Sequence, residues 1–263
     1  VVGLIAIGVL IALGVQRPVA IFAFGVVAFV ATSIGEEWWR GTTARHRSGD
    51  NWALAWWRLV NGNRPRHGGY IVHISILMLG LGIIGTNFYQ QRTDGALALG
   101  ESLVLDNYRI EYVYNGDSSR PDRIAQWAEM SVYEIDPDDY KQEISFAKAQ
   151  GSSGFTLNDN TLRPNDELID TIKPWHGFYI DFNMASVRSG IRSTVVEDLY
   201  VIPRDFLADG RVSLAVSINP LAWWLWASGP FFILGTMVAL WPQPAVEKRP
   251  THKQLKREPE ADI

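Results

Sequence analysis

Three stretches of this 263-residue chain carry almost no charge, and they constrain its fold more than any other feature. The stretches are Val1–Ile34, Tyr70–Phe88 and Ile218–Trp241, and the charged residues concentrate between them. A bilayer core of about 30 Å takes roughly 20 apolar residues as a helix, and each stretch is near that length or longer. The sequence therefore predicts an integral membrane protein with one large polar insertion.

The first apolar stretch is interrupted at Gln16-Arg17-Pro18. A single helix over the whole stretch would be about 51 Å long, far more than one span requires. We therefore expect two transmembrane helices within residues 1–35 that meet at a tight turn, the first of them truncated. The absence of an initiator Met favours a fragment whose upstream part is missing. The predicted fold class is an α-helical transmembrane bundle of about four helices with an inserted extracytoplasmic β-rich domain, either a barrel or a sandwich.

The distribution of Lys and Arg predicts how the helices are oriented, because short cytoplasmic connections are rich in these residues. Residues 36–69 and the tail 242–263 are basic and are expected in the cytoplasm. The insertion, residues 89–217, holds 12 basic and 21 acidic residues, a net charge of −9, and is expected on the opposite side. The two transmembrane helices of residues 70–88 and 218–241 then connect the two sides.

Residues 36–69 also hold five tryptophans among their arginines: Trp38, Trp39, Trp52, Trp56 and Trp57. This composition suits short helices lying in the lipid headgroup layer, or a simple aromatic belt at the membrane interface. Membrane lipid is the expected partner of this segment. The arginines need no nucleic acid to explain them, so no nucleic-acid partner is expected.

The insertion is predicted to form β structure. Apolar and polar residues alternate over Ser102–Tyr114 with a polar break, and aromatic and β-branched residues recur in Trp127–Ile135 and Gly177–Met184. The last strand is expected at Arg192–Ile202. Turns are expected at the Gly- and Asp-rich sequences between these runs, namely Asn115-Gly116-Asp117, Asp136-Pro137-Asp138, Gly151-Ser152-Ser153-Gly154 and Asp209-Gly210. About 130 residues are enough for a core of their own.

Several chemistries have no motif in the chain. It contains no phosphate-binding Gly-rich loop, no Gly-x-Ser-x-Gly elbow and no His-Glu-x-x-His zinc motif. It has no cysteine, which excludes disulfides, Cys-ligated zinc and thiol redox chemistry within the chain. Any thiols that take part in a reaction must come from a partner.

His73 is the main candidate for a functional residue, because it lies near the start of the apolar run Tyr70–Phe88. An ionisable ring at membrane depth needs a partner there. Imidazole is a common axial ligand of haem iron, so a bound metal or cofactor is one interpretation. A hydrogen bond to a neighbouring helix is the other, and the sequence does not separate the two.

The helical face that His73 shares with Ile76, Leu77 and Gly80 bears on this choice. Gly80, with Gly82 and Gly85 further along, would leave room for a broad flat ligand. Equally, small residues in membranes let another helix pack closely. The other four histidines suggest less. His46, His67 and His252 are expected to be solvated, and His176 is placed in a turn of the insertion where it could touch a ligand edge.

Four sequence pieces, in this order, resemble the carboxy-terminal part of the CcmF family. They are Ala31-Thr32-Ser33-Ile34-Gly35-Glu36-Glu37-Trp38-Trp39-Arg40-Gly41, Asn63-Arg64-Pro65-Arg66-His67-Gly68-Gly69-Tyr70-Ile71-Val72-His73, Val196-Glu197-Asp198-Leu199-Tyr200-Val201, and Ile218-Asn219-Pro220-Leu221 followed by Trp224 and Trp226. CcmF is the large haem-handling subunit of bacterial cytochrome c maturation, a haem lyase subunit. The Gly-Gly-Tyr-x-x-His piece is the most specific, and the resemblance covers nearly the whole chain.

The resemblance implies that His73 is an axial ligand of a b-type haem, with Gly80 facing that haem. The second ligand, and the histidines that hold the haem in transit, would lie in the upstream part of the same protein. Neither His67 nor His176 inherits a role. The implied partners are the haem chaperone, apocytochrome c and other maturation subunits. The implied location is the bacterial inner membrane, with the β domain in the periplasm.

The function implied is assistance in covalent attachment of haem to apocytochrome c, which this chain could not catalyse alone. No acid, base or nucleophile is predicted. An alternative is a membrane-anchored extracytoplasmic binding or scaffold module in which His73 is structural. A haem- or quinone-binding subunit of a respiratory complex suits the single membrane histidine and the large insertion less well.

Overall fold

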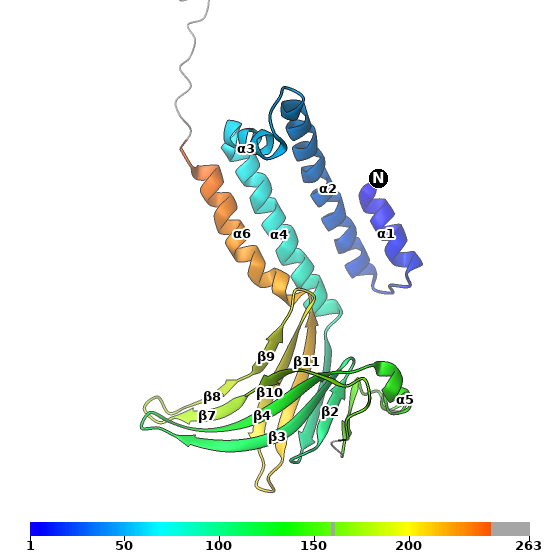
Figure 1. The fold of residues 1–263 in the computed structure, drawn as a ribbon, viewed down its shortest axis with the longest axis vertical. Helices are drawn as coiled ribbons and strands as arrows, with labels where there is room; N and C mark the ends of the chain where they lie inside the picture. Colours follow the sequence, from blue (N-terminus) through cyan, green and yellow to red (C-terminus); the bar gives the residue numbers. More distant parts are fainter. Residues whose placement is uncertain (159–160, 243–263) are drawn as a thin grey trace, which may run out of the picture.

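A computed structural model describes residues 1–158 and 161–242 of the chain. Its helices are α1 (Val2–Ala12), α2 (Pro18–His46), α3 (Trp52–Gly62), α4 (Arg64–Phe88), α5 (Lys141–Ala149) and α6 (Ala222–Leu240), with a short 3-10 helix η1 (Pro137–Tyr140). Helices α1, α2, α3, α4 and α6 form one part of the molecule, and the strands form the other, with α5 at their side (Figure 1).

Helices α2, α4 and α6 are long and apolar enough to cross a membrane. The predicted helical bundle with an inserted β domain is thereby confirmed, although α1 is a shorter apolar helix of 11 residues. Pro18 begins α2, as expected for a residue that lacks a backbone N–H. Both α2 and α4 extend further than the apolar runs. Helix α2 continues to His46, and α4 begins at Arg64.

Small residues let α4 and α6 pack closely along their length. A Cβ on Gly82 would lie 2.9 Å from the backbone nitrogen of Leu225, and one on Gly68 would lie 2.4 Å from the backbone nitrogen of Ala239. A Cβ on Gly85 would lie 2.1 Å from the backbone oxygen of Pro220, just before α6 begins. From the other helix, Gly235 faces the backbone of Val72 in the same way. Helices in lipid associate through this kind of close packing, because lipid tails give no hydrophobic driving force between them.

Two packed antiparallel sheets form the β domain. The first contains β1 (Gln91–Leu97), β11 (Val212–Pro220), β10 (Glu197–Phe206) and β9 (Gly190–Ser193), in that order. The second runs β5 (Gly154–Leu157), β2 (Ser102–Leu105), β3 (Tyr108–Ser119), β4 (Arg123–Glu134), β7 (Trp175–Tyr179) and β8 (Met184–Arg188), and β6 (Glu167–Ile172) also pairs with β4. The core between the sheets includes Leu103, Ile110 and Met130 from one side and Leu199, Leu214 and Val216 from the other.

A second, polar cluster lies on the outer face of the larger sheet. The Arg109 side chain is fully buried and bonds to Asp166 at 3.1 Å, to the Thr161 carbonyl at 2.7 Å and to Ser102 at 3.0 Å. The Tyr140 hydroxyl donates to Asp166 at 2.7 Å, and burial followed by this bond raises the pKa of Tyr140. Removing one partner of such a buried pair typically costs about 3–5 kcal/mol, so this cluster fixes the segment before β6 onto the sheet.

The strands differ from the sequence prediction in several places. The expected strand Ser102–Tyr114 is two strands joined by a turn at Asp106, whose φ is +52°. The expected turn Asn115-Gly116-Asp117 lies inside β3, where Gly116 faces the ring of Trp127. Gly177–Met184 contains the end of β7, the turn at residues 180–183 and the start of β8, and Arg192–Ile202 is broken between β9 and β10. The turns at Gly151 and Gly210 are confirmed, with φ of +75° and +85°.

Candidate functional site

An apolar groove of about 320 Å³ lies between α2 and α4, and His73 is part of its lining. The two helices lie side by side in Figure 1. Helix α2 contributes five lining residues and α4 two, namely Phe29, Val30, Ser33, Ile34, Glu37, Tyr70 and His73. His73 is exposed, so in a membrane its ring is available to a ligand or to another membrane segment.

One nitrogen of the His73 ring is already engaged. Its Nδ1 lies 2.8 Å from the carbonyl oxygen of Gly69, one helical turn earlier. A carbonyl can only accept, so Nδ1 must carry the proton and donate it. In the neutral ring this leaves the lone pair on Nε2, and a backbone carbonyl that orients the other nitrogen is a common arrangement for metal-ligating histidines.

The glycines of α4 divide into two groups. A Cβ on Gly80 or on Gly69 would meet nothing within 4 Å, whereas Cβ atoms on Gly82 and Gly85 would clash with Leu225 and Pro220. The helix-packing interpretation therefore holds for Gly82, whereas Gly85 lies against the end of β11 just before α6. Open space at Gly80 is compatible with a facing ligand, and its role stays a prediction.

A polar cluster closes the end of the groove that is furthest from the β domain. Arg66 bonds to Glu37 at 2.6 Å and donates from Nε to the Tyr70 hydroxyl at 2.9 Å. His67 lies beside this cluster and is buried, with 3% of its surface exposed, so the expectation that it is solvated was wrong. Trp38 donates from its indole nitrogen to His67 Nδ1 at 3.1 Å, which gives the buried ring a partner.

The remaining histidines lie elsewhere. His46 Nδ1 lies 2.7 Å from the Asp50 carbonyl oxygen, and its ring stacks on Trp52 with centroids 4.2 Å apart, so it is not simply solvated. His176 lies in strand β7, opposite Gln126 and Val187, and not in a turn. His252 lies outside the described residues.

Within residues 1–158 and 161–242, no three His, Asp or Glu side chains gather as a metal site would require. A metal ion held by His73 must therefore bring its other ligands with it or take them from another segment. Iron in a porphyrin meets this condition, because the macrocycle supplies four of its ligands and the protein supplies only axial ones.

Two of the sequence pieces singled out above are neighbours in the structure. Antiparallel pairing of β10 and β11 places Asp198 opposite Asn219 and Glu197 opposite Pro220. Asp198 accepts from Ser193, and Asn219 accepts from Gln90 at 2.5 Å. The Asp-Leu-Tyr and Asn-Pro-Leu pieces therefore form one buried polar junction where the β domain meets α4 and α6.

The sequence and the fold of the chain were compared with those of known proteins. No protein-family model matches the chain. A cytochrome c-type biogenesis protein CcmF from Pseudomonas fluorescens is 24% identical over 178 residues, which cover 67% of this chain. A solved structure of a cytochrome c heme lyase CcmF matches with a TM-score of 0.62 over 92% of this chain, at 21% identity. The chain is similar to part of CcmF.

The similarity to CcmF has a defined extent. The aligned region is 22% of the curated CcmF sequence and 34% of the solved CcmF chain, so this chain spans a minor part of either protein. The structural match includes the helices and the β domain together, because it covers 92% of the chain. The match to CcmF therefore shows the fold of the chain, and the site residues depend on the geometry described above.

Proposed function

We propose that this chain is part of a cytochrome c maturation haem lyase and that His73 supplies one axial ligand to a b-type haem. The observation that carries the proposal is the His73 ring itself, because its Nδ1–H bond to Gly69 leaves Nε2 free in a groove lined by α2 and α4. The similarity to CcmF supports the wider role in haem handling.

The residues around His73 fit a haem. The groove is apolar along Phe29, Val30 and Ile34, which suits a porphyrin face, and Gly80 adds no side chain on the same helical face. When bound, haem supplies a redox-active iron that can exchange electrons with a second haem. The polypeptide contributes the ligand, its orientation by Gly69, and an environment that excludes water. The second axial ligand comes from the upstream part of the protein.

The attachment reaction requires groups that this chain does not carry. Covalent attachment to the haem vinyl groups needs thiols, and the chain contains no cysteine, so the thiols belong to apocytochrome c. The haem in transit is brought by its chaperone. The acidic β domain, with a net charge of −9, faces the periplasm in this proposal and favours encounter with basic surfaces on the chaperone, the apocytochrome or other maturation subunits.

The visible spectrum tests the His73 assignment. The chain is expressed in bacterial membranes together with the upstream part that this proposal requires, and the purified complex is examined for b-type haem absorption. We expect His73→Ala to remove most of this absorption, because one axial ligand is lost, and exogenous imidazole to restore part of it.

His176→Ala is the matched control, because His176 lies in the β domain and is also partly exposed. It should leave the spectrum unchanged. If wild type shows no b-type absorption, or if His73→Ala retains it in full, the ligand assignment is wrong. The scaffold alternative then remains, in which His73 only donates to Gly69.

A further inference from the structure

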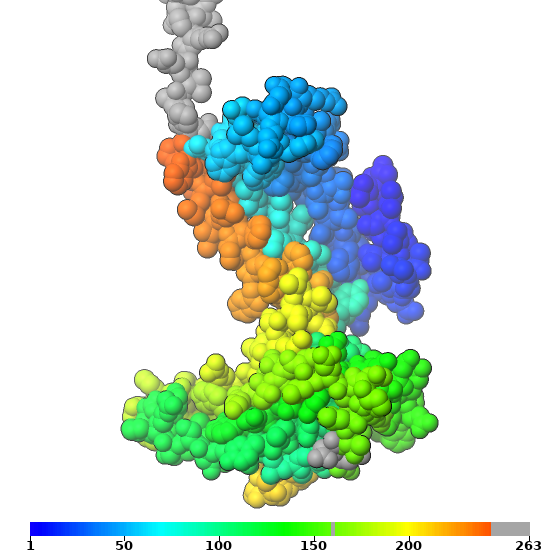
Figure 2. All heavy atoms as spheres, in the orientation of Figure 1, coloured from blue at the N-terminus to red at the C-terminus, as the bar shows by residue number. Residues whose placement is uncertain are grey.

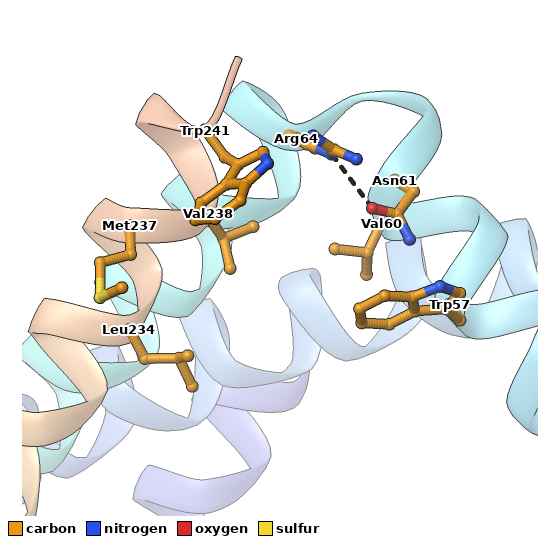
Figure 3. Close-up of a pocket in the computed structure, with 8 residues that line it drawn as sticks. All are labelled: Trp57, Val60, Asn61, Arg64, Leu234, Met237, Val238 and Trp241. Carbon is orange, nitrogen blue, oxygen red and sulfur yellow. Dashed lines mark hydrogen bonds between the residues drawn. The ribbon is translucent and has the colours of Figure 1, made fainter. Parts of the chain in front are cut away.

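A second groove lies at the other side of α4, where the start of α4 meets α3 and the end of α6. It has a volume of about 400 Å³ and is lined by eight residues, which Figure 3 shows: Trp57, Val60, Asn61, Arg64, Leu234, Met237, Val238 and Trp241. It is separate from the His73 groove, with which it shares no residue. It lies at the end of the helical part that is furthest from the β domain (Figure 1).

The wall that α6 contributes is apolar and open. Leu234, Met237, Val238 and Trp241 follow the helical spacing of one face, and Leu234 and Met237 are about half exposed. Such a strip would fit one extended hydrocarbon chain lying along the helix. In a membrane, a strip of this kind on a spanning helix faces lipid unless another helix covers it.

The end of this wall carries a positive charge. Arg64 donates from Nε to the Asn61 side-chain oxygen at 3.0 Å (Figure 3). It also donates from Nη1 to the Pro242 carbonyl at 2.8 Å. Both acceptors are neutral. In the described part of the chain no carboxylate pairs with Arg64, whereas Arg58 pairs with Asp50 at 2.5 Å and Arg66 with Glu37 at 2.6 Å.

Trp57 and Trp241 lie on either side of Arg64, and each is 59% exposed. Tryptophan prefers the level of the lipid headgroups, because its ring is apolar and its N–H is polar. The tryptophans therefore indicate that Arg64 lies at headgroup depth, with the Leu234–Val238 strip at acyl-chain depth. A cation above an apolar strip is the complement of an anionic phosphate above an acyl chain.

We propose that this groove binds one anionic phospholipid, with the phosphate on Arg64 and an acyl chain along α6. Arg64 has the remaining N–H donors needed for a phosphate oxygen, and Asn61 holds the guanidinium in place. The lipid contacts α3, α4 and α6 at the cytoplasmic end of the helices, where α3 makes few direct contacts with α6. This inference depends on the helices spanning a membrane and does not depend on haem binding.

Native mass spectrometry of the detergent-purified full chain tests the headgroup contact. The protein is offered phosphatidylglycerol and phosphatidylcholine with identical acyl chains, and the retained lipid is measured. We expect phosphatidylglycerol to be retained preferentially and Arg64→Gln to reduce its retention roughly tenfold, the effect of losing about one charge-assisted contact. Arg64→Lys, which keeps the charge, should retain an intermediate amount, and inorganic phosphate alone should not displace the lipid.

Two matched controls distinguish binding in the groove from the general effects of losing a positive charge or adding a bulky side chain. Arg47→Gln removes a charge from an exposed position outside the groove and should not change lipid retention. Val238→Trp fills the strip and should reduce retention, whereas Ile233→Trp, at an exposed position of α6 that does not line the groove, should not.

Equal retention of the two lipids by wild type would overturn the proposal. So would an equal loss in Arg47→Gln and Arg64→Gln, which would indicate only bulk attraction. Displacement of the lipid by inorganic phosphate would indicate an anion site without the acyl-chain contact. If Arg64→Gln does not fold, the Val238→Trp and Ile233→Trp pair decides the question.

Discussion

Tyr108 illustrates how single side chains tie the β domain to the membrane junction. It is buried at the start of β3, and its hydroxyl donates to Glu197 of β10 at 2.9 Å. Burial, followed by this bond to a carboxylate, raises the pKa of Tyr108 to about 12. The protonated phenol is therefore strongly preferred in the folded chain.

This pKa predicts a loss of stability at high pH. The unfolded chain releases the Tyr108 proton near the ordinary value of 10.0, so the stabilisation is complete below pH 10 and is lost as the pH rises toward 12. Its magnitude is up to about 3 kcal/mol. We expect unfolding of the full chain in detergent to become easier over this window, and Tyr108→Phe to show a shallower decline. Tyr114→Phe, at an exposed position of the same strand, should behave as wild type. Parallel curves for wild type and Tyr108→Phe would contradict the assignment.

At the level of single residues, the sequence indicated His73 but not its bond to Gly69, which depends on the helical carbonyl one turn away. It did not indicate that His67 is buried, because Trp38 comes from a different helix. Likewise, the buried pair of Arg109 and Asp166 joins residues that are 57 positions apart. Partners of this kind are set by tertiary structure, and no local pattern in one sequence specifies them.

At the level of elements, the apolar runs predicted the long helices because the bilayer requires roughly 20 apolar residues. Their ends were not predicted, since α2 and α4 continue helical through polar residues where hydropathy gives no signal. The turn predicted at Gly116 was wrong for a related reason, because this residue lies inside β3. Glycine in a strand can mark a close approach as well as a turn, and here a Cβ would lie 2.6 Å from the Trp127 ring.

The packing of α4 on α6 leads to a prediction about glycine substitutions. Gly85→Ala would place a methyl group 2.1 Å from the backbone oxygen of Pro220, which ends β11 just before α6, so α4 must move away from the start of α6. We expect a loss of roughly 1–3 kcal/mol, the usual cost of overpacking. Thermal unfolding of the full chain in detergent measures this.

Gly69→Ala is the matched control on the same helix, because nothing lies within 4 Å of its Cβ position. It should be neutral or slightly stabilising, since alanine favours helix more than glycine does. Equal destabilisation by both variants would show that α4 and α6 do not pack as described.

At the level of the whole molecule, the charge asymmetry predicts which side of the membrane each part faces. The chain has no cysteine, so single cysteines can be introduced without removing others. Ser48→Cys lies between α2 and α3, and Asp181→Cys lies in the turn between β7 and β8. Both positions are exposed.

In intact cells, a membrane-impermeant maleimide should label Asp181→Cys and not Ser48→Cys, and lysis should expose Ser48→Cys to the reagent. The reverse pattern would place the β domain in the cytoplasm and would exclude a periplasmic role for it. Labelling of both positions in intact cells would show that residues 36–69 are not shielded by the membrane.

The β domain is connected to the helical part at one place, where α4 leads into β1 and β11 leads into α6. Figure 2 shows part of residues 190–220, in yellow, directly below the helices and above the green part of the β domain. Helix α4 ends at Phe88 and β1 begins at Gln91, while β11 ends at Pro220 and α6 begins at Ala222. Strands β1 and β11 pair directly, with Gln91 opposite Ile218, so the chain enters and leaves the domain at adjacent positions.

This adjacency makes the β domain a removable module. Without it, α4 and α6 are the two arms of one helical hairpin, already in contact through Gly68, Gly82 and Gly235. A short linker between Phe88 and Ala222 would join those arms, and both helices would keep their positions. The helical part and the β domain could thus be transplanted, exchanged between relatives or lost independently, and only the junction formed by β1 and β11 would have to be rebuilt.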